Sequence, residues 1–126
     1  MMAKSVFTRS APEPAGPYSQ AVVQGGYVFC SGQLGIVPES GSLVSDSASQ
    51  QAEQVLKNLR EVLIACSSDL SRVVKVTLYL TDLRDFSSVN EVYARYLGDV
   101  RPARTTVQVQ ALPKGALVAM DAIAFL

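Results

Sequence analysis

The stretch ASQQAEQVLKNLREVLIACSSDLSRVVKVTLYL, residues 48–80, decides the fold because the spacing of its apolar side chains changes partway along. Over residues 48–66 the apolar side chains recur every three or four positions, which predicts a long helix with one apolar face. Ser47 and Gln50, three positions apart, fit a capping box at its start. Over residues 72–80 the spacing shortens to two, which predicts a half-buried strand.

The segment before this stretch predicts a β-hairpin. Residues 18–23 and 27–31 read as two strands separated by Gly25-Gly26. Paired glycines accept the positive φ values that a two-residue turn requires, so the two strands are expected to pair directly. A second turn is expected at Pro-Glu-Ser-Gly, residues 38–41.

The segment after it predicts a second helix and two closing strands. The helix is expected from about Asp85, a candidate N-cap, to Leu97, with Gly98 in the C′ position. The strands cover residues 105–110 and 117–125 and are joined by Leu-Pro-Lys-Gly.

This order of elements predicts a single α+β domain, residues 1–126, in which two helices cover one face of a mixed sheet. In the strand 72–80, one face is expected to carry Val74, Val76, Leu78 and Leu80. The uncovered face of the sheet is expected to carry Val73, Tyr79, Ala119, Ile123 and either Val107 or Val109. A half-apolar sheet face left uncovered in so small a chain favours burial against another subunit, so we expect a homo-oligomer.

The composition narrows the classes of function. The chain has 126 residues, of which 48% are hydrophobic and 17% charged, with 11 Lys+Arg against 11 Asp+Glu. Zero net charge argues against nucleic acid as the main partner, because binding to nucleic acid rests largely on neutralising phosphates. No apolar run has the length of a membrane span or the character of a secretion signal, so we expect a soluble, cytoplasmic protein that binds no membrane.

Histidine is absent, which excludes a Ser-His-Asp triad and removes the commonest transition-metal ligand. The two cysteines, Cys30 and Cys66, match no metal-binding or CxxC spacing and are expected to be buried thiols in a reducing compartment. With no histidine to activate it, Cys30 is a poor candidate nucleophile. We therefore expect neither a metal nor a cofactor.

Arg104, in the segment Arg101-Pro-Ala-Arg104-Thr, is the leading candidate for binding a small anion. An arginine at the mouth of a strand, with a proline fixing its approach, can hold a planar carboxylate through a bidentate fork. Strand alternation places it in a polar row with Thr106, Gln108 and Gln110. A surface arginine beside a strand is the alternative, and the local sequence leaves both open.

Three other polar side chains are candidates for the same site. Tyr18 follows a rigid Gly-Pro turn and is expected at the start of a strand; otherwise it is an interfacial or core tyrosine. Ser31, before a glycine at the end of a strand, offers an anion a hydroxyl and a backbone N–H, or simply turns the chain. Asn90, on the inward face of the second helix, braces a loop or contacts a ligand.

Several motifs occur in a fixed order along the chain. They are Gly16-Pro-Tyr-Ser-Gln20, Cys30-Ser-Gly-Gln33, Asp82-Leu-x-Asp-Phe86 followed by Val89-Asn90, Arg101-Pro-Ala-Arg104, Ala111-Leu-Pro-Lys-Gly115 and Asp121-Ala-Ile-Ala124. With these motifs the sequence, from about Ser10 to its C-terminus, resembles the RidA/YjgF/UK114 family. The resemblance implies a chorismate-mutase-like (YjgF-like) fold that forms a homotrimer with clefts between adjacent subunits.

The resemblance also implies an activity. Family members are best known as 2-iminobutanoate/2-iminopropanoate deaminases, which hydrolyse reactive imine and enamine acids to 2-keto acids and ammonia. It implies that Arg104 binds the substrate carboxylate, that Tyr18 and Ser31 line the cleft and that Asn90 supports it. Thr106, also counted with the substrate-binding residues, stands where some members have cysteine. The implied partners are small 2-imino and 2-keto carboxylates.

The sequence departs from the family at one position in the last strand. Deaminase members carry two alternating glutamates before Ala-Ile-Ala, and the first is proposed to orient the attacking water. Here Ala119 takes the first position and Asp121 the second. Alanine cannot accept a proton. A side chain that does so typically raises the rate of such reactions by about 10²–10⁴-fold. Asp121 shares the face of Ala119 but stands about 6.6–6.8 Å further along the strand, so it is only a weak candidate.

Three functions stay open on these grounds. One is an imine or enamine deaminase with Arg104 as carboxylate clamp, weakened by the loss of the glutamate. Another is a non-catalytic regulatory trimer that binds small carboxylates in the same cleft. An endoribonuclease or translation inhibitor is least favoured, because the chain is neutral and lacks histidine.

Overall fold

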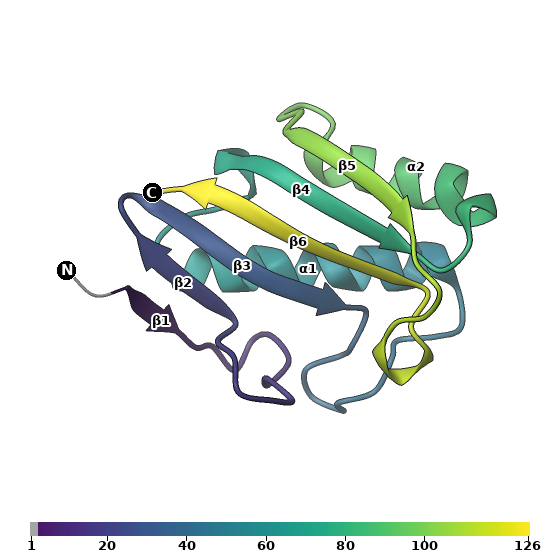
Figure 1. The fold of residues 1–126 in the computed structure, drawn as a ribbon, viewed down its shortest axis with the longest axis horizontal. Coiled ribbons are helices and arrows are strands. Elements are labelled where there is room, and N and C mark those ends of the chain that lie inside the picture. Colours follow the sequence, from purple (N-terminus) through teal and green to yellow (C-terminus); the bar gives the residue numbers. More distant parts are fainter. Residues whose placement is uncertain (1–2) are drawn as a thin grey trace.

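The computed structural model describes residues 3–126, which form a six-stranded sheet with two helices on one of its faces (Figure 1). The strands are β1 (Lys4–Val6), β2 (Ala21–Gln24), β3 (Tyr27–Leu34), β4 (Val73–Leu80), β5 (Ala103–Gln108) and β6 (Val118–Phe125). The helices are α1 (Ala48–Ala65) and α2 (Phe86–Leu97), with short 3-10 turns at Leu70–Arg72, Leu83–Asp85 and Pro113–Gly115. The predicted α+β class is confirmed.

The last strand lies at the centre of the sheet. The strand order is β1-β2-β3-β6-β4-β5, so β6 is inserted between β3 and β4 and runs antiparallel to both. The remaining pairs are antiparallel, except that β4 and β5 are parallel and connected through α2. The C-terminal segment therefore places its side chains in the middle of both faces of the sheet.

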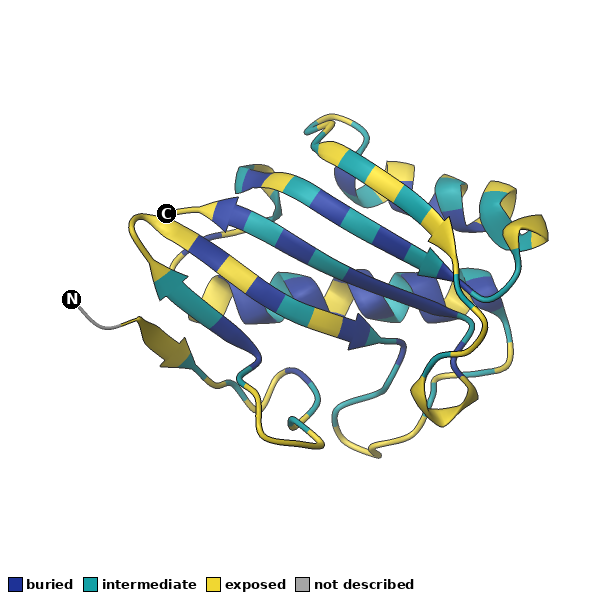
Figure 2. Cartoon of the chain, viewed as in Figure 1, coloured by how far each residue is buried: buried dark blue, intermediate teal, exposed yellow. Residues whose placement is uncertain are grey.

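The hydrophobic core lies between the sheet and α1. Buried and less buried residues alternate along β3, β4 and β6 (Figure 2), as expected for strands with one covered face. The apolar stripe predicted for residues 48–66 is buried in α1, where its fully buried members are Val55, Leu56, Leu59, Val62 and Leu63. Burying one such side chain contributes about 1.5–3 kcal/mol, which explains why the helix adopts this orientation.

Both ends of α1 follow from local chemistry. The backbone N–H of Gln50 donates to Ser47 Oγ at 3.3 Å, which confirms the predicted start. At the other end, Ser67 has a positive φ of 63°. The amides of Ser67 and Ser68 donate to the carbonyls of Ile64 and Leu63, which is a Schellman arrangement.

The predicted hairpin is present, but its first strand begins later than expected. Gly25 and Gly26 have φ values of 60° and 82°, as a type I′ turn requires. The strand starts at Ala21, after the buried Gln20, whose side chain hydrogen-bonds to the N-terminal segment while its backbone carbonyl accepts the Ser31 amide at 2.9 Å. The expectation that Tyr18 begins a strand was therefore wrong, and Tyr18 lies in the loop before β2.

The faces of β4 differ from the prediction at its start. The pairing register with β6 shifts between Val73 and Lys75, which is the signature of a bulge. One extra residue reverses the faces of the residues before it, so Val73 is buried on the helix side while Val74 is 41% exposed. The assignment of these two valines to faces was wrong. Tyr79, Ala119, Ile123 and Val107 do share the uncovered face.

The ends of α2 and the position of β5 also differ from the prediction. Asp82, not Asp85, makes the side-chain cap, because its carboxylate accepts the Arg84 amide and a 3-10 turn precedes the helix. Gly98 has a right-handed helical backbone conformation and not the left-handed one typical of a C′ glycine. A positive φ, of 53°, occurs at Arg101 instead. β5 covers Ala103–Gln108, two residues earlier at each end than expected. No helix within residues 3–126 is long and apolar enough to cross a membrane.

Candidate functional site

Arg104 lies on the helix-covered side of the sheet, beside α2. Its Cα partner across the β4–β5 ladder is Val76, whose side chain is buried under the helices. Arg104 Nη1 donates to Asn90 Oδ1 at 2.8 Å. The guanidinium carbon lies 4.6 Å from the centre of the Tyr93 ring and 5.4 Å from that of Phe86. Two aromatic rings and one amide therefore fix the orientation of the cation.

The charge of Arg104 is available to a ligand. Within residues 3–126 no carboxylate forms an ion pair with it. Tyr93 beside it is only 7% exposed, and within the same residues its hydroxyl has no hydrogen-bond partner of ordinary geometry. Burial raises the pKa of Tyr93 against the opposing effect of the Arg104 charge, so this hydroxyl is a donor at neutral pH. An unpaired guanidinium next to an unsatisfied donor suits a carboxylate.

The polar row predicted along β5 is present on this side of the sheet. Thr106 follows Arg104 on the same face and is half-buried. Gln108 comes next, and its Oε1 accepts the Leu83 amide at 2.8 Å, which attaches β5 to the turn before α2. Three predicted site residues are thus gathered here: Arg104, Asn90 and Thr106. Asn90 braces an arginine of β5 and not the loop that was expected, and its contact with a ligand stays a prediction.

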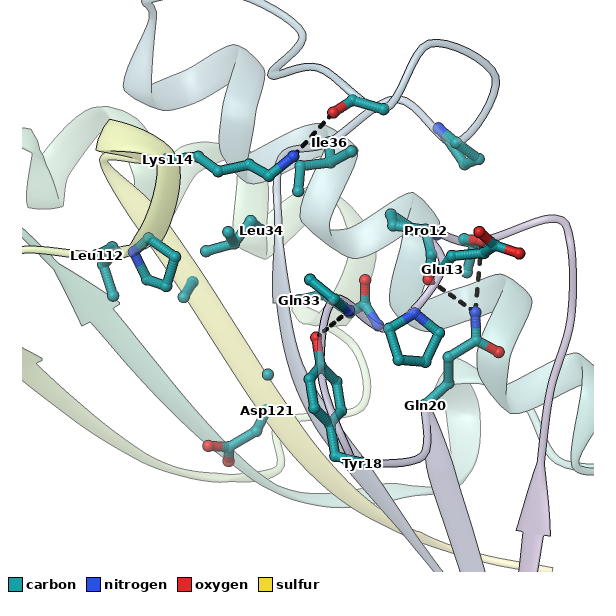
Figure 3. Close-up of a pocket in the computed structure, with 18 of the residues that line it drawn as sticks. Pro12, Glu13, Tyr18, Gln20, Gln33, Leu34, Ile36, Leu112, Lys114 and Asp121 are labelled. Atoms are coloured by element: carbon teal, nitrogen blue, oxygen red, sulfur yellow. Dashed lines mark hydrogen bonds between the residues drawn. The ribbon is translucent and has the colours of Figure 1, made fainter.

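A cavity of about 870 Å³ opens on the other face of the sheet (Figure 3). Its floor is formed by β3, β4 and β6, and its walls by the segment around residues 9–18 and by the loops near residues 36–41 and 112–114. The polar side chains that line it include Arg9, Tyr18, Tyr79, Lys114 and Asp121. Arg104 is not among them.

Tyr18 and Ser31 belong to this cavity side. Tyr18 is 53% exposed, and its hydroxyl accepts the Ala15 amide at 3.2 Å. Ser31 lies inside β3, where the register shifts between Cys30 and Gln33, so the expectation that it ends the strand was wrong. Ser31 Oγ donates to the Ser19 carbonyl at 2.5 Å and so ties the Tyr18 loop to the sheet.

Ala119 lies in the floor of the cavity, directly opposite Tyr79 on β4. Asp121, two residues further, shares this face, as predicted, and its carboxylate accepts a hydrogen bond from the Tyr79 hydroxyl at 2.8 Å. Within one chain the predicted site residues therefore form two groups. The group at Arg104 lies on the helix side, and the group at Tyr18 and Ala119 lies on the open side.

The sequence reasoning named Asn90 but missed that Phe86 and Tyr93 also support Arg104, and that Tyr79 supports the other group. Phe86, Asn90 and Tyr93 are spaced four and three residues apart, so they share one face of α2, and this spacing was the available signal. Only the parallel pairing of β5 with β4 shows that this face meets Arg104. The role of Tyr79 had no local signal, since its partners come from β6.

Cys30 is not a nucleophile in this fold. Its thiol is buried, and burial first, then the nearby Cys66 and Asp121, raise its pKa to about 12. The thiolate is therefore not populated at neutral pH. Among the described residues, 3–126, no three His, Cys, Asp or Glu side chains cluster as a metal site would require.

The protein is thus a small α+β domain with two helices on one face of a mixed sheet, an arginine without an ion pair among the described residues at one sheet edge, and a cavity on the open face. Residues 8–126 match the Endoribonuclease L-PSP family, and the chain belongs to this family. The resemblance to the RidA/YjgF/UK114 proteins is thereby confirmed.

Relatives within this family carry deaminase names. The chain is 51% identical over 121 residues to Reactive Intermediate Deaminase A, chloroplastic, of Arabidopsis thaliana, covering 96% of this chain and 65% of that protein. It is 44% identical over 124 residues to the human 2-iminobutanoate/2-iminopropanoate deaminase, covering 98% and 90%. The crystal structure of E. coli TdcF with bound serine superimposes with a TM-score of 0.92 at 36% identity, covering 98% of each chain.

Proposed function

We propose that this protein hydrolyses reactive 2-imino and enamine acids to 2-keto acids and ammonia, with Arg104 binding the substrate carboxylate. The observation that carries the proposal is the oriented, unpaired guanidinium of Arg104, beside the unsatisfied hydroxyl of Tyr93. The relatives named as 2-iminobutanoate/2-iminopropanoate deaminases act on acids of this class. Serine, the ligand in the TdcF structure, is likewise a small carboxylate.

The complete site, in this proposal, forms between subunits of a homotrimer. Arg104 and the cavity lined by Tyr18 lie on opposite sides of the sheet, so one chain alone does not bring them together. Apolar side chains on the open face supply a surface for association, since Phe29 and Phe125 are 44% and 42% exposed. Arg104 and Thr106 of one subunit then meet Tyr18 and Ser31 at the cavity of the next.

The assembly has its own test. Ile123 lies on the open face, paired with Phe29, whereas Ile64 is 54% exposed on α1, on the opposite side of the molecule. Ile123→Lys is expected to convert the trimer to smaller species in sedimentation analysis, because it buries an unpaired charge in the interface. Ile64→Lys is the matched control and keeps the native mass. Equal masses for both variants contradict this assembly.

Arg104 supplies binding and charge neutralisation, and these alone accelerate hydrolysis. Holding the carboxylate positions the imine carbon, and the fixed charge of Arg104 stabilises charge that develops on the reacting group. The methyl group of Ala119 neither orients water nor accepts a proton. Acceptance of the proton from the attacking water therefore requires another group.

A second candidate function follows from the same residue. If no other group replaces the missing glutamate, the protein is a non-catalytic regulatory trimer that binds small carboxylates through Arg104. The endoribonuclease function rests on the family description and on the names of similar structures from Thermotoga maritima and Entamoeba histolytica. It conflicts with the zero net charge, because a nuclease must hold phosphates.

One experiment separates these functions. The imine released by an amino-acid oxidase is followed with and without the purified protein. The deaminase proposal expects faster imine decay with the wild type and at least a hundredfold loss in Arg104→Ala. Arg84→Ala is the control, since Arg84 is exposed and pairs only with Asp82. Wild type that binds 2-keto acids without accelerating decay supports the regulatory function instead.

A further inference from the structure

A tyrosine stands directly across from the position where the acidic residue is missing. Tyr79 is the Cα partner of Ala119 in the antiparallel β4–β6 ladder, and Asp121 is the partner of Thr77. Directly opposed side chains in such a ladder have Cβ atoms about 4.5–5.5 Å apart. Tyr79, Ala119 and Asp121 all line the same cavity.

The tyrosine and the aspartate act as one polar unit. Tyr79 Oη donates to Asp121 Oδ2 at 2.8 Å, diagonally across the ladder. The hydrogen bond to Asp121, followed by burial, raises the pKa of Tyr79, so the phenol keeps the proton that it donates to the carboxylate. Within residues 3–126 the structure gives Asp121 Oδ1 no hydrogen-bond donor, so this oxygen is free to accept one.

We propose that Asp121 is the catalytic base of this protein and that Tyr79 is the residue that positions it, together replacing the acidic group absent from position 119. This inference rests on the proposed deaminase function. Asp121 alone stands one strand repeat too far from the position of Ala119. The phenol of Tyr79 shortens that gap, because its oxygen retains lone pairs with which to hold a water beside the free carboxylate oxygen.

The small side chain of Ala119 is required by this arrangement. A longer residue there would fill the space between Tyr79 and the substrate, and an acidic one would place a second negative charge beside Asp121. With alanine, that space is open to the cavity. Figure 3 shows Asp121 projecting from β6 on the side of the cavity remote from Lys114, with Tyr18 between Asp121 and the outer wall.

The reaction balances with Asp121 as the only proton carrier. The water oxygen adds to the carbon of the protonated imine, the C=N π electrons move to nitrogen, and one water proton passes to Asp121. Asp121 then returns that proton to the nitrogen. The C–N bond breaks with its electron pair on the departing ammonia, which takes the hydroxyl proton as the C=O bond forms. One protonated imine and one water thus yield one 2-keto acid and one ammonium ion.

The competing explanation is purely structural. In that case the Tyr79–Asp121 hydrogen bond only joins β4 to β6, and the base comes from elsewhere. The other carboxylates near the site are that of Glu13, which lines the cavity, and that of Glu91, which is exposed and adjacent to Asn90 on α2. The two explanations predict different pH profiles and different responses to substitution.

The test measures kcat, KM and their pH dependence for imine hydrolysis in the assembled protein. Asp121→Asn is expected to lower kcat about 10²–10³-fold, as loss of a general base does, while binding of 2-oxobutanoate is unchanged. Tyr79→Phe is expected to lower kcat while KM stays unchanged, because the water loses one of the two oxygens that hold it beside the carboxylate. Glu91→Gln and the remote, exposed Asp99→Asn serve as controls and keep the wild-type profile.

Each outcome decides the inference. Wild-type kcat in Asp121→Asn overturns it, as does loss of activity in Glu91→Gln alone. An unchanged kcat in Tyr79→Phe removes the positioning role, and this variant decides alone if Asp121→Asn does not fold. Failure of the deaminase function itself looks different, since the wild type is then inactive and the inference falls with it. If the wild type is active, and Arg104→Ala loses activity while Asp121→Asn does not, the deaminase function stands and only the assignment of Asp121 as the base is refuted.

Discussion

Gln20 connects the stability of this fold to the shape of its cavity. Its side chain is 2% exposed and is hydrogen-bonded at both ends to the N-terminal segment. Oε1 accepts the Thr8 amide at 2.7 Å, and Nε2 donates to the carbonyls of Thr8 at 3.0 Å and Pro12 at 2.8 Å. That segment supplies Arg9, Pro12 and its neighbours to the cavity wall. Nε2 also donates to the Ala11 carbonyl at 3.4 Å, and Gln20→Ala removes all four bonds at once.

The expected cost follows from these contacts. Each hydrogen bond contributes about 0.5–1.5 kcal/mol net, and the buried groups left without partners add to the loss, so Gln20→Ala is expected to cost about 2–4 kcal/mol. A chain of this length loses about 4 °C in Tm for each kcal/mol, which gives a decrease of roughly 8–16 °C. Gln20→Glu is expected to be at least as damaging, because its carboxylate faces three carbonyl oxygens where the amide donated.

The assay compares thermal unfolding with amide hydrogen exchange at equal protein concentration. Gln24→Ala is the matched control, since Gln24 is an exposed residue at the end of β2. Only Gln20→Ala is expected to speed exchange across residues 8–15, because only that variant releases the cavity wall. A Tm for Gln20→Ala within about 2 °C of that for Gln24→Ala, with exchange unchanged, refutes the reasoning.

Three further predictions test other parts of the structure. Ser67→Gly is expected to raise the free energy of unfolding in urea by about 0.5–1 kcal/mol, because Ser67 has a φ of 63° and glycine adopts such a φ without strain. A decrease in this free energy contradicts the left-handed cap. Cys30, with its pKa raised to about 12 by burial, is expected to resist iodoacetamide at pH 8 in the native protein and to react after denaturation; prompt native labelling contradicts its burial. The raised pKa of Tyr93 means that its contribution to stability is present below about pH 10 and is lost as the pH rises through the folded-state pKa. Tyr93→Phe is therefore expected to leave the free energy of unfolding at pH 7 nearly unchanged and to reduce its decline between pH 9 and 11. A decline identical to that of the wild type shows that Tyr93 does not titrate in this range.

Much of the fold was predictable because it depends on residues close together in the chain. The apolar stripe of α1, its Ser47 cap and the Gly25-Gly26 turn each involve side chains within a few positions of one another. The errors occurred where a partner strand or a side chain far along the chain intervened. The bulge that exchanges the faces of Val73 and Val74 depends on the register with β6, which is remote in sequence.

The candidate site divides in the same way. Arg104 and Asn90 were recognisable from their sequence positions and from the family resemblance, and the structure adds that they contact each other. Neither the two rings over the guanidinium nor the opposition of Tyr79 and Ala119 was predictable, because each contact joins elements brought together only by strand order.

By itself, the sequence determined the secondary structure, the α+β class and the residue types available for chemistry, because hydrophobic period, turn chemistry and composition act locally. Only the tertiary structure decided which of those residues meet. The insertion of β6 between β3 and β4 puts Ala119 and Asp121 on the open face, and the parallel pairing of β5 turns Arg104 to the helix side. Strand order is set by packing summed over the whole core, and no single segment of the chain encodes that sum.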